Sequence, residues 1–549
     1  MVTHRSKNFR IWIRKGSPTR ERHEDLARTL EEELEALIEL LEVERDRIPT
    51  PIDVFIHDDI PALQDAILLR KGEKARAVYR APLDLLESEE PRSRLAELAL
   101  AYGWGRCGSQ ILQIGVTQYA AEPERNFHAI IAALPDRLFL TLPDLLLLEK
   151  RRRLPQSLYQ RYDAPYSPAM IGSLVDLKDL FELSENGEEQ PDDLPVLEAA
   201  SFVQFLIETK GGIRVLKQAW GTGTTEQLLE RIDPASPMRL GTAWVEAVME
   251  RGKKSPDFPY LRAYYLLESG DPDTAWAEVS EWPTGNISEQ ELYLIGRCAL
   301  TVEGFAEANR LVDQFSREET PAKLKDFLAL YEGWIMGETE RLRVLVPETL
   351  CGSLQELVTT CEQAYSLLIT RLELLQEDLP QRLTLFLYPD IASRDRGASF
   401  TTSFSATQNA ILHILWIDNL AYSLGEILPA YAWRKETYSR LLRAGLAVAL
   451  SRPKEHLLEQ GCQLWRDGQW VPLSVLDFGA ANRETVEVEA GLLAHFLLET
   501  FGARVVREIW ISTSPFDRYF SVDTALEEIC GTNREQIEAF LFSSLLNCN

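Results

Sequence analysis

Two stretches of the chain repeat each other: Glu198–Trp220 reads EAASFVQFLIETKGGIRVLKQAW, and Glu489–Trp510 reads EAGLLAHFLLETFGARVVREIW. A one-residue slip brings the closing Trp220 and Trp510 into register. So many coincidences in one window indicate a duplicated domain, and the type of that domain is the best guide to function. The residue pairs that share a constant offset of 291 positions are Glu198/Glu489, Ala199/Ala490, Phe205/Phe496, Leu206/Leu497, Glu208/Glu499, Thr209/Thr500 and Gly211/Gly502.

Length and charge limit the classes of protein to consider. A chain of 549 residues is too long for one hydrophobic core and suggests about three or four domains. The formal net charge of −27 repels a phosphate backbone, so we expect no nucleic-acid partner. The most apolar stretch, Leu138–Leu148, is interrupted by Pro143 and Asp144 and is too short to span a bilayer, so we expect no membrane segment.

The cysteines and the amino terminus predict a cytoplasmic protein. Seven cysteines with no C-x-x-C pair are not typical of a disulfide framework or a zinc knuckle, and a reducing compartment fits them best. Basic residues near the amino terminus are not followed by an apolar run, so they do not form a signal peptide.

The order of predicted elements is also repeated. In the first copy a strand at 9–13 precedes a long amphipathic helix at 21–44 and an alternating strand at 52–56. In the second copy a helix at 354–375 precedes a strand at 383–387. Two helical segments follow in each copy, at 92–102 and 110–121 and at 422–433 and 438–450.

The first copy is predicted to carry an insertion. The offset between the copies falls from about 330 to 291 before the shared Glu-Thr motif, and the extra residues lie at about 142–195. A basic cluster and an acidic run in this stretch indicate an inserted helix and a solvated loop.

Between the copies lies a third repeat, of helix pairs. Small residues recur 33 positions apart at Ala263, Gly296 and Ala329, and turn glycines recur at similar spacing at Gly270, Gly304 and Gly337. Such a period is typical of stacked helix pairs and is similar to tetratricopeptide repeats. The predicted fold is therefore mostly helical α+β. Its predicted domains are 1–250, a repeat segment at 251–347, and a second copy at 348–549.

The order helix, strand, two central helices and a helix reading A-x-S-F-V-x-F-L-I-E-x-x-G resembles the gluzincin-like peptidases called peptidase MA-like. Members of that family often carry tetratricopeptide repeats beside the peptidase domain. The resemblance implies a central helix with H-E-x-x-H, in which two histidines on one helix face bind Zn²⁺ and the Glu acts as general base. It also implies a downstream Glu as third ligand, and a metal-bound water whose pKa is about 7.

Both copies lack these ligands. The resemblance places the general-base position at Glu97 in the first copy and at Glu426 in the second. A lone Glu cannot hold catalytic zinc, which needs about three protein ligands, and all seven histidines lie outside the central helices. We therefore expect no metal, no cofactor and no peptidase activity. The residues that stand at the lost ligand positions are Ala96, Leu100 and Ile114 in the first copy, and Gly425, Pro429 and Ala444 in the second.

Aromatic residues of the repeat segment are candidates for contacts with a protein partner. Packing between helices is the other interpretation, because tetratricopeptide cores also use aromatic side chains. The candidates are Tyr264, Tyr265, Trp276, Tyr293, Tyr331 and Trp334.

Three functional hypotheses follow. The first is a pseudo-peptidase that serves as a protein-binding scaffold, because solenoids and the clefts of inactive enzymes both suit extended peptides. The second is a hydrolase with a non-standard active site, suggested by paired acids such as Asp58-Asp59 and Asp192-Asp193. The third is a regulated partner of a separately encoded protease or effector.

Overall fold

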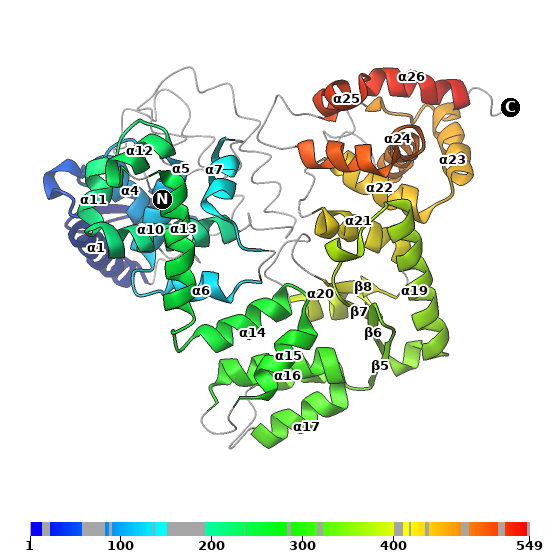
Figure 1. The fold of residues 1–549 in the computed structure, drawn as a ribbon, viewed down its shortest axis with the longest axis horizontal. Helices are drawn as coiled ribbons and strands as arrows, with labels where there is room; N and C mark the ends of the chain where they lie inside the picture. The colour runs from blue at the N-terminus through cyan, green and yellow to red at the C-terminus, as the bar shows by residue number, and fades with distance from the viewer. Residues whose placement is uncertain are drawn as a thin grey trace. The chain divides into compact units, whose positions relative to one another are not determined.

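The computed structural model describes residues 2–13, 22–57, 83–86, 91–135, 138–150, 193–234, 236–282, 287–315, 322–399, 410–416, 419–433, 439–473, 483–513 and 522–545. The chain divides into two compact units, Met1–Phe258 and Pro259–Asn549. Within the described residues it is mostly helical and contains two small mixed sheets, as predicted for an α+β protein (Figure 1). Most of the predicted insertion, at 151–192, and the pair Asp58-Asp59 lie outside the described residues.

The first unit opens with a four-stranded sheet in the order β1-β2-β3-β4. Strand β2 pairs with β1 in the antiparallel sense and with β3 in the parallel sense, and β4 extends the parallel side. The elements are β1 (Val2–Arg5), β2 (Phe9–Ile13), α1 (His23–Leu40), β3 (Ile52–His57), β4 (Leu83–Leu86), α4 (Pro91–Gly103), α5 (Gln110–Ala121), α6 (Phe127–Ala133), α7 (Leu142–Lys150), α10 (Asp193–Lys210), α11 (Ile213–Ala219), α12 (Thr225–Ile232) and α13 (Pro237–Ala247).

The second unit contains the repeat-like helices and a second sheet in the order β5-β6-β7-β8, with the same pattern of one antiparallel and two parallel pairs. The helices before the sheet are α14 (Phe258–Glu268), α15 (Pro272–Ser280), α16 (Glu289–Glu303), α17 (Phe305–Phe315) and α18 (Ala322–Ala329). The sheet and its connections are β5 (Trp334–Glu338), β6 (Leu342–Pro347), α19 (Leu354–Arg371), β7 (Leu383–Tyr388), α20 (Ile391–Ser399) and β8 (Ile411–Leu415). The remaining helices are α21 (Leu420–Ala432), α22 (Arg440–Ser451), α23 (Lys454–Arg466), α24 (Arg483–Ser512), α25 (Val522–Cys530) and α26 (Arg534–Leu545).

The two units share two details of backbone geometry, at a glutamate after a helix and at a glycine. The second residue after α1 and the second residue after α19 are both glutamates with positive φ, Glu42 at 49° and Glu373 at 51°. A glycine of similar backbone geometry breaks the long helix in each unit: Gly212 (φ 85°, ψ −171°) and Gly502 (φ 82°, ψ 166°). The structural partner of Gly502 is thus Gly212, and the pairing with Gly211 expected from the sequence is corrected by one residue. The one-residue slip that brings Trp220 and Trp510 into register therefore lies before this glycine.

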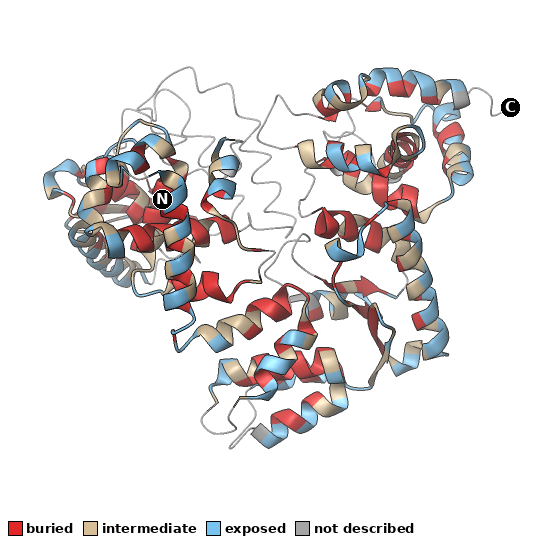
Figure 2. Ribbon diagram, viewed as in Figure 1, coloured by how far each residue is buried: buried red, intermediate tan, exposed pale blue. Residues whose placement is uncertain are grey.

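Strands β6, β7 and β8 of the second sheet are largely buried on both faces (Figure 2). Because side chains alternate along a strand, Leu342, Val344 and Val346 of β6 face the core formed with α19, α21, α22 and α24. The opposite face packs against α14, α16 and α18 in a second cluster, here called the sheet–helix cluster. Its sheet members are Leu345, Phe386, Tyr388, Ile411 and Leu415, and its helix members include Leu266, Leu294, Phe327 and Tyr331.

The predicted repeat segment therefore ends differently from expectation. Helices α14 and α15 follow each other through a turn, as do α16 and α17, and Gly270 and Gly304 have positive φ at these turns. The third turn glycine, Gly337, lies instead in strand β5. The predicted boundary at 347 is wrong, because β5 and β6 belong to the second sheet and the repeat-like helices cover one of its faces.

Candidate functional site

In the first unit, the predicted metal-ligand positions lie on the packed helices α4 and α5. Ala96 and Leu100 are buried in α4, at 0% and 2% exposure. Ile114 of α5 is partly buried. Glu97 also lies on α4, with its side chain 11% exposed and 3.7 Å from Arg94, its neighbour one turn away. The three predicted ligand positions thus contribute hydrocarbon to the core, and the remaining carboxylate has a cation beside it.

In the second unit, the packing of α21 on α22 leaves no space for a ligand at one of these positions. A Cβ built on Gly425 would lie 2.9 Å from the Cα of Ala447. A histidine side chain at 425 would therefore overlap the backbone of α22. Pro429 lies buried inside α21, and Ala444 is partly buried in α22. Glu426, at the predicted general-base position, is partly exposed on α21.

In each unit a glycine lies where two helices cross closely, α5 with α10 and α22 with α24. A Cβ on Gly115 of α5 would lie 2.3 Å from the carbonyl oxygen of Ala199 on α10. A Cβ on Gly445 of α22 would lie 2.4 Å from the same atom of Ala490 on α24. The two glycines allow the same close helix crossing, so these positions are explained by packing.

The first residue of the repeated motif is a buried glutamate that holds a loop. Glu198 Oε1 accepts a hydrogen bond from the backbone N–H of Leu140 at 2.5 Å, and Glu489 Oε1 accepts one from Val471 at 2.8 Å. Both side chains are fully buried. Burial raises the pKa of Glu489 to about 8, against the opposing hydrogen bond from Val471 and with a smaller contribution from Glu538. Position and burial make these glutamates loop anchors.

A serine, a histidine and a glutamate meet in the first unit, which sequence reasoning missed. His128 of α6 lies with Nδ1 2.9 Å from Ser201 Oγ and Nε2 3.5 Å from Glu208 Oε2, both on α10. Burial lowers the pKa of His128, helped by the charge of Arg251 and opposed by Glu208. The residues are too far apart in the chain for a local motif to show their proximity.

This arrangement lacks what a nucleophile needs. Ser201 is fully buried, and its Oγ also accepts a hydrogen bond from Trp244 Nε1 at 3.1 Å. A nucleophilic hydroxyl has to reach a substrate carbon, and this one lies inside the contact between helices. We interpret the three residues as a polar contact that joins α6, α10 and α13.

The aromatic candidates of the repeat segment are mostly packing residues. Tyr265 and Tyr331 are only 6% and 0% exposed, so the prediction that they contact a partner is wrong. Tyr331 instead forms a buried hydrogen-bond chain, with its OH 2.9 Å from Tyr388 OH, which lies 2.7 Å from His413 Nδ1. The three others that are partly buried against the same cluster are Tyr264, Tyr293 and Trp334.

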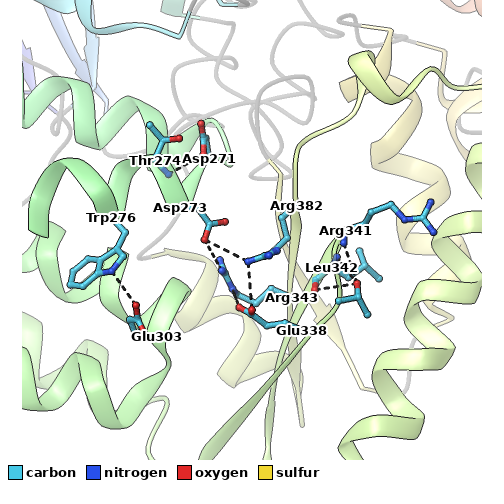
Figure 3. Close-up of polar contacts among 11 residues, drawn as sticks. Asp271, Asp273, Thr274, Trp276, Glu303, Glu338, Arg341, Leu342, Arg343 and Arg382 are labelled. Carbon is cyan, nitrogen blue, oxygen red and sulfur yellow. Dashed lines mark hydrogen bonds and ion pairs between the residues drawn. The ribbon is translucent and has the colours of Figure 1, made fainter.

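Trp276 is the aromatic candidate with a polar contact at the surface. Its indole Nε1 donates to Glu303 Oε1 at 3.2 Å, between α15 and the end of α16 (Figure 3). Its ring is partly buried against the sheet–helix cluster. It therefore presents one edge of an aromatic ring next to a carboxylate.

Three further features of the described residues bear on function. Within the described ranges, no group of three or more His, Cys, Asp or Glu side chains is placed to hold a metal ion. None of the helices in the described part of the chain is long and apolar enough to cross a membrane. Cys462 is disulfide-bonded, which the sequence did not predict, and the free thiols among the described residues are Cys107, Cys298, Cys351, Cys361 and Cys530.

No protein-family model, curated protein or solved structure matches this chain.

Proposed function

We propose that the chain is a non-catalytic pseudo-peptidase, built from two gluzincin-like (peptidase MA-like) domains, that acts as a protein-binding scaffold or regulatory partner. The observation that carries the proposal is the replacement of every predicted zinc ligand in both copies. Catalytic zinc sites use about three protein ligands, and the three first-copy positions hold Ala96, Leu100 and Ile114.

The second copy supports the same conclusion in a different way. The contact between Gly425 and Ala447 excludes a ligand side chain at 425, because a Cβ alone would already lie 2.9 Å from the neighbouring backbone. Restoring a histidine there would require the two central helices to move apart. Two copies that lost the same site by different substitutions are expected of a domain retained for its shape.

Metal analysis of the purified full-length chain tests the proposal. After removal of metal and reloading with Zn²⁺, we expect less than one tightly bound zinc per chain, with the same content in Glu97→Ala and Glu426→Ala. Stoichiometric zinc that either substitution removes would overturn the proposal. Digestion of casein and of a peptide library should remain blank with and without Zn²⁺, and zinc-dependent cleavage would contradict it.

The scaffold role needs a separate experiment. The tagged chain is used to capture partners from its native host, alongside Trp276→Ala and Trp465→Ala. Trp276 lies on the helical segment, whereas Trp465 is 46% exposed on α23 and serves as a matched control. We expect Trp276→Ala alone to reduce capture. Equal capture by all three proteins would exclude Trp276 from the contact.

A further inference from the structure

The two sheets carry an arginine at the same position. Arg10 of β2 lies opposite Asp53 of β3, and Arg343 of β6 lies opposite Thr384 of β7. The parallel pairing and the order of the strands are the same in both sheets. The second sheet therefore has a threonine where the first sheet has a carboxylate.

The first arginine is neutralised inside its own sheet. Arg10 Nη2 donates to Asp53 Oδ2 at 2.7 Å, and Trp12 Nε1 donates to Asp53 Oδ1 at 2.9 Å. Asp53 is only 1% exposed, whereas Arg10 is 32% exposed. The carboxylate that balances this arginine therefore comes from the neighbouring strand.

The second arginine is neutralised partly from outside its sheet (Figure 3). Arg343 Nη2 donates to Asp273 Oδ1 of helix α15 at 2.8 Å, and its Nε donates to Glu338 Oε1 of β5 at 2.6 Å. Arg382, just before β7, lies 3.6 Å from each of the same two carboxylates. The guanidinium groups of Arg343, in the sheet, and Arg382, just before it, thus share one carboxylate of the sheet and one of the helical segment.

Arg343 and the residue opposite it, Thr384, each have a buried polar atom without a hydrogen-bond partner. Arg343 is 1% exposed, and its Nη1 has no hydrogen-bond partner. Thr384 is fully buried, and its Oγ1 has none either. A buried charge is costly unless a partner compensates it. Arg343 and Arg382 are balanced by two carboxylates, those of Asp273 and Glu338. Loss of the Asp273 carboxylate would therefore leave one positive charge in excess among these residues.

Two neutral contacts place the same helices on the sheet. A Cβ on Gly270, at the turn before α15, would lie 2.2 Å from the Cβ of Ala410, which precedes β8. At the other end of the segment, Tyr331 bonds to Tyr388 of β7. The docked position of Asp273 is thus fixed by steric fit and hydrogen bonding on both sides.

We infer that Asp273 is a docking determinant: it supplies from the helical segment the carboxylate that the second sheet lacks at position 384. The helices α14–α18 are then an obligatory layer of the second unit, held on the sheet by the ion pair between Asp273 and Arg343. They are not an independent repeat module that happens to lie beside it. This conclusion concerns the fold and does not depend on the proposed scaffold function.

The test is a double-mutant cycle in the full-length chain, with amide hydrogen exchange as readout. We expect Asp273→Asn to speed exchange in α15 about tenfold, the loss expected for one hydrogen bond to a charged group, and to speed exchange in β6 and β7 as well. Thr384→Asp places a carboxylate opposite Arg343, as Asp53 does opposite Arg10. In the double variant we expect β6 and β7 to regain slow exchange while α15 remains fast.

Two controls separate charge from bulk. Thr384→Asn has nearly the size of Asp without its charge and should not rescue β6 and β7. Glu307→Gln removes one member of the exposed pair with Arg310 in α17 and should change nothing in α15. The inference is overturned if Asp273→Asn leaves α15 unchanged, or if Thr384→Asn rescues as well as Thr384→Asp.

Discussion

Gly445 lies so close to Ala490 that a methyl group on it would sit 2.4 Å from the carbonyl oxygen of Ala490. The same relationship joins Gly115 to Ala199 in the first unit. Since both partners are backbone atoms of helices, the overlap cannot be relieved by rotating a side chain. The close crossing of the two helices therefore depends on the absence of a Cβ atom at Gly115 and Gly445.

Gly445→Ala is accordingly expected to destabilise the protein, although alanine favours helices. Overpacking of this kind costs about 1–3 kcal/mol, which exceeds the helix-propensity gain of about 1 kcal/mol. Chemical denaturation measures the change in unfolding free energy. Gly352→Ala is the control, because nothing lies within 4 Å of its Cβ position. An unaltered midpoint in Gly445→Ala would show that the two helices separate easily.

Protonation of Glu489 should make the stability of the protein depend on pH. Burial raises the pKa of Glu489 from the ordinary 4.5 to about 8. The folded protein therefore retains a proton that the unfolded chain releases, and this contribution to stability is lost as pH rises from about 4.5 to about 8. In Glu489→Gln, unfolding midpoints should fall less over this range. Glu508→Gln, which changes an exposed carboxylate, should keep the slope of the parent protein.

His413 should have the opposite effect, on the acid side. Burial lowers the pKa of His413 from 6.5 to about 3, with smaller contributions from Arg297 and Arg394. Stability from the neutral imidazole is complete above about pH 6.5 and is lost as pH falls toward about 3. His413→Gln should flatten this decline in thermal unfolding, whereas the exposed His456→Gln should not. A parent-like slope in His413→Gln would contradict the assignment.

The buried ion pair between α14 and α16 should be sensitive to loss of one partner. Arg297 Nη2 lies 2.5 Å from Glu268 Oε1, and the two side chains are 6% and 2% exposed. Removing one partner of such a pair costs about 3–5 kcal/mol, while replacing both by apolar residues is often neutral. We expect Glu268→Gln to be strongly destabilising and Glu268→Met with Arg297→Leu to recover most of the loss, measured by denaturation. Equal stability of the single and double variants would argue against the charge as the cause.

The sequence predicted the elements whose periodicity is strong. The predicted helix at 110–121 has the observed bounds of α5, and the strands at 52–56 and 383–387 lie within β3 and β7. These segments have an alternating or helical pattern of apolar residues that identifies them locally. The shared Glu-Ala motif lies on helices α10 and α24.

The errors arose where a local pattern has two interpretations. Gly337 fitted the period of the turn glycines, but it pairs with Val344 of β6 and so belongs to β5. Tyr265 and Tyr331 are aromatic residues, which are expected both in a binding groove and in a hydrophobic core. Only the sheet face that covers them decides between these interpretations. The meeting of His128 with Ser201 depends on tertiary packing, which no local motif encodes.

The order of the second unit along the chain has a consequence for its synthesis. Helices α14–α18 leave the ribosome before β6, β7 and β8, whose side chains cover their inner face. Until Leu415 has emerged, Leu266, Leu294 and Phe327 lack the complete sheet face against which they pack. Nascent chains with exposed apolar surface are prone to aggregation, so this half of the protein is expected to be most prone to aggregation before its sheet has been synthesised.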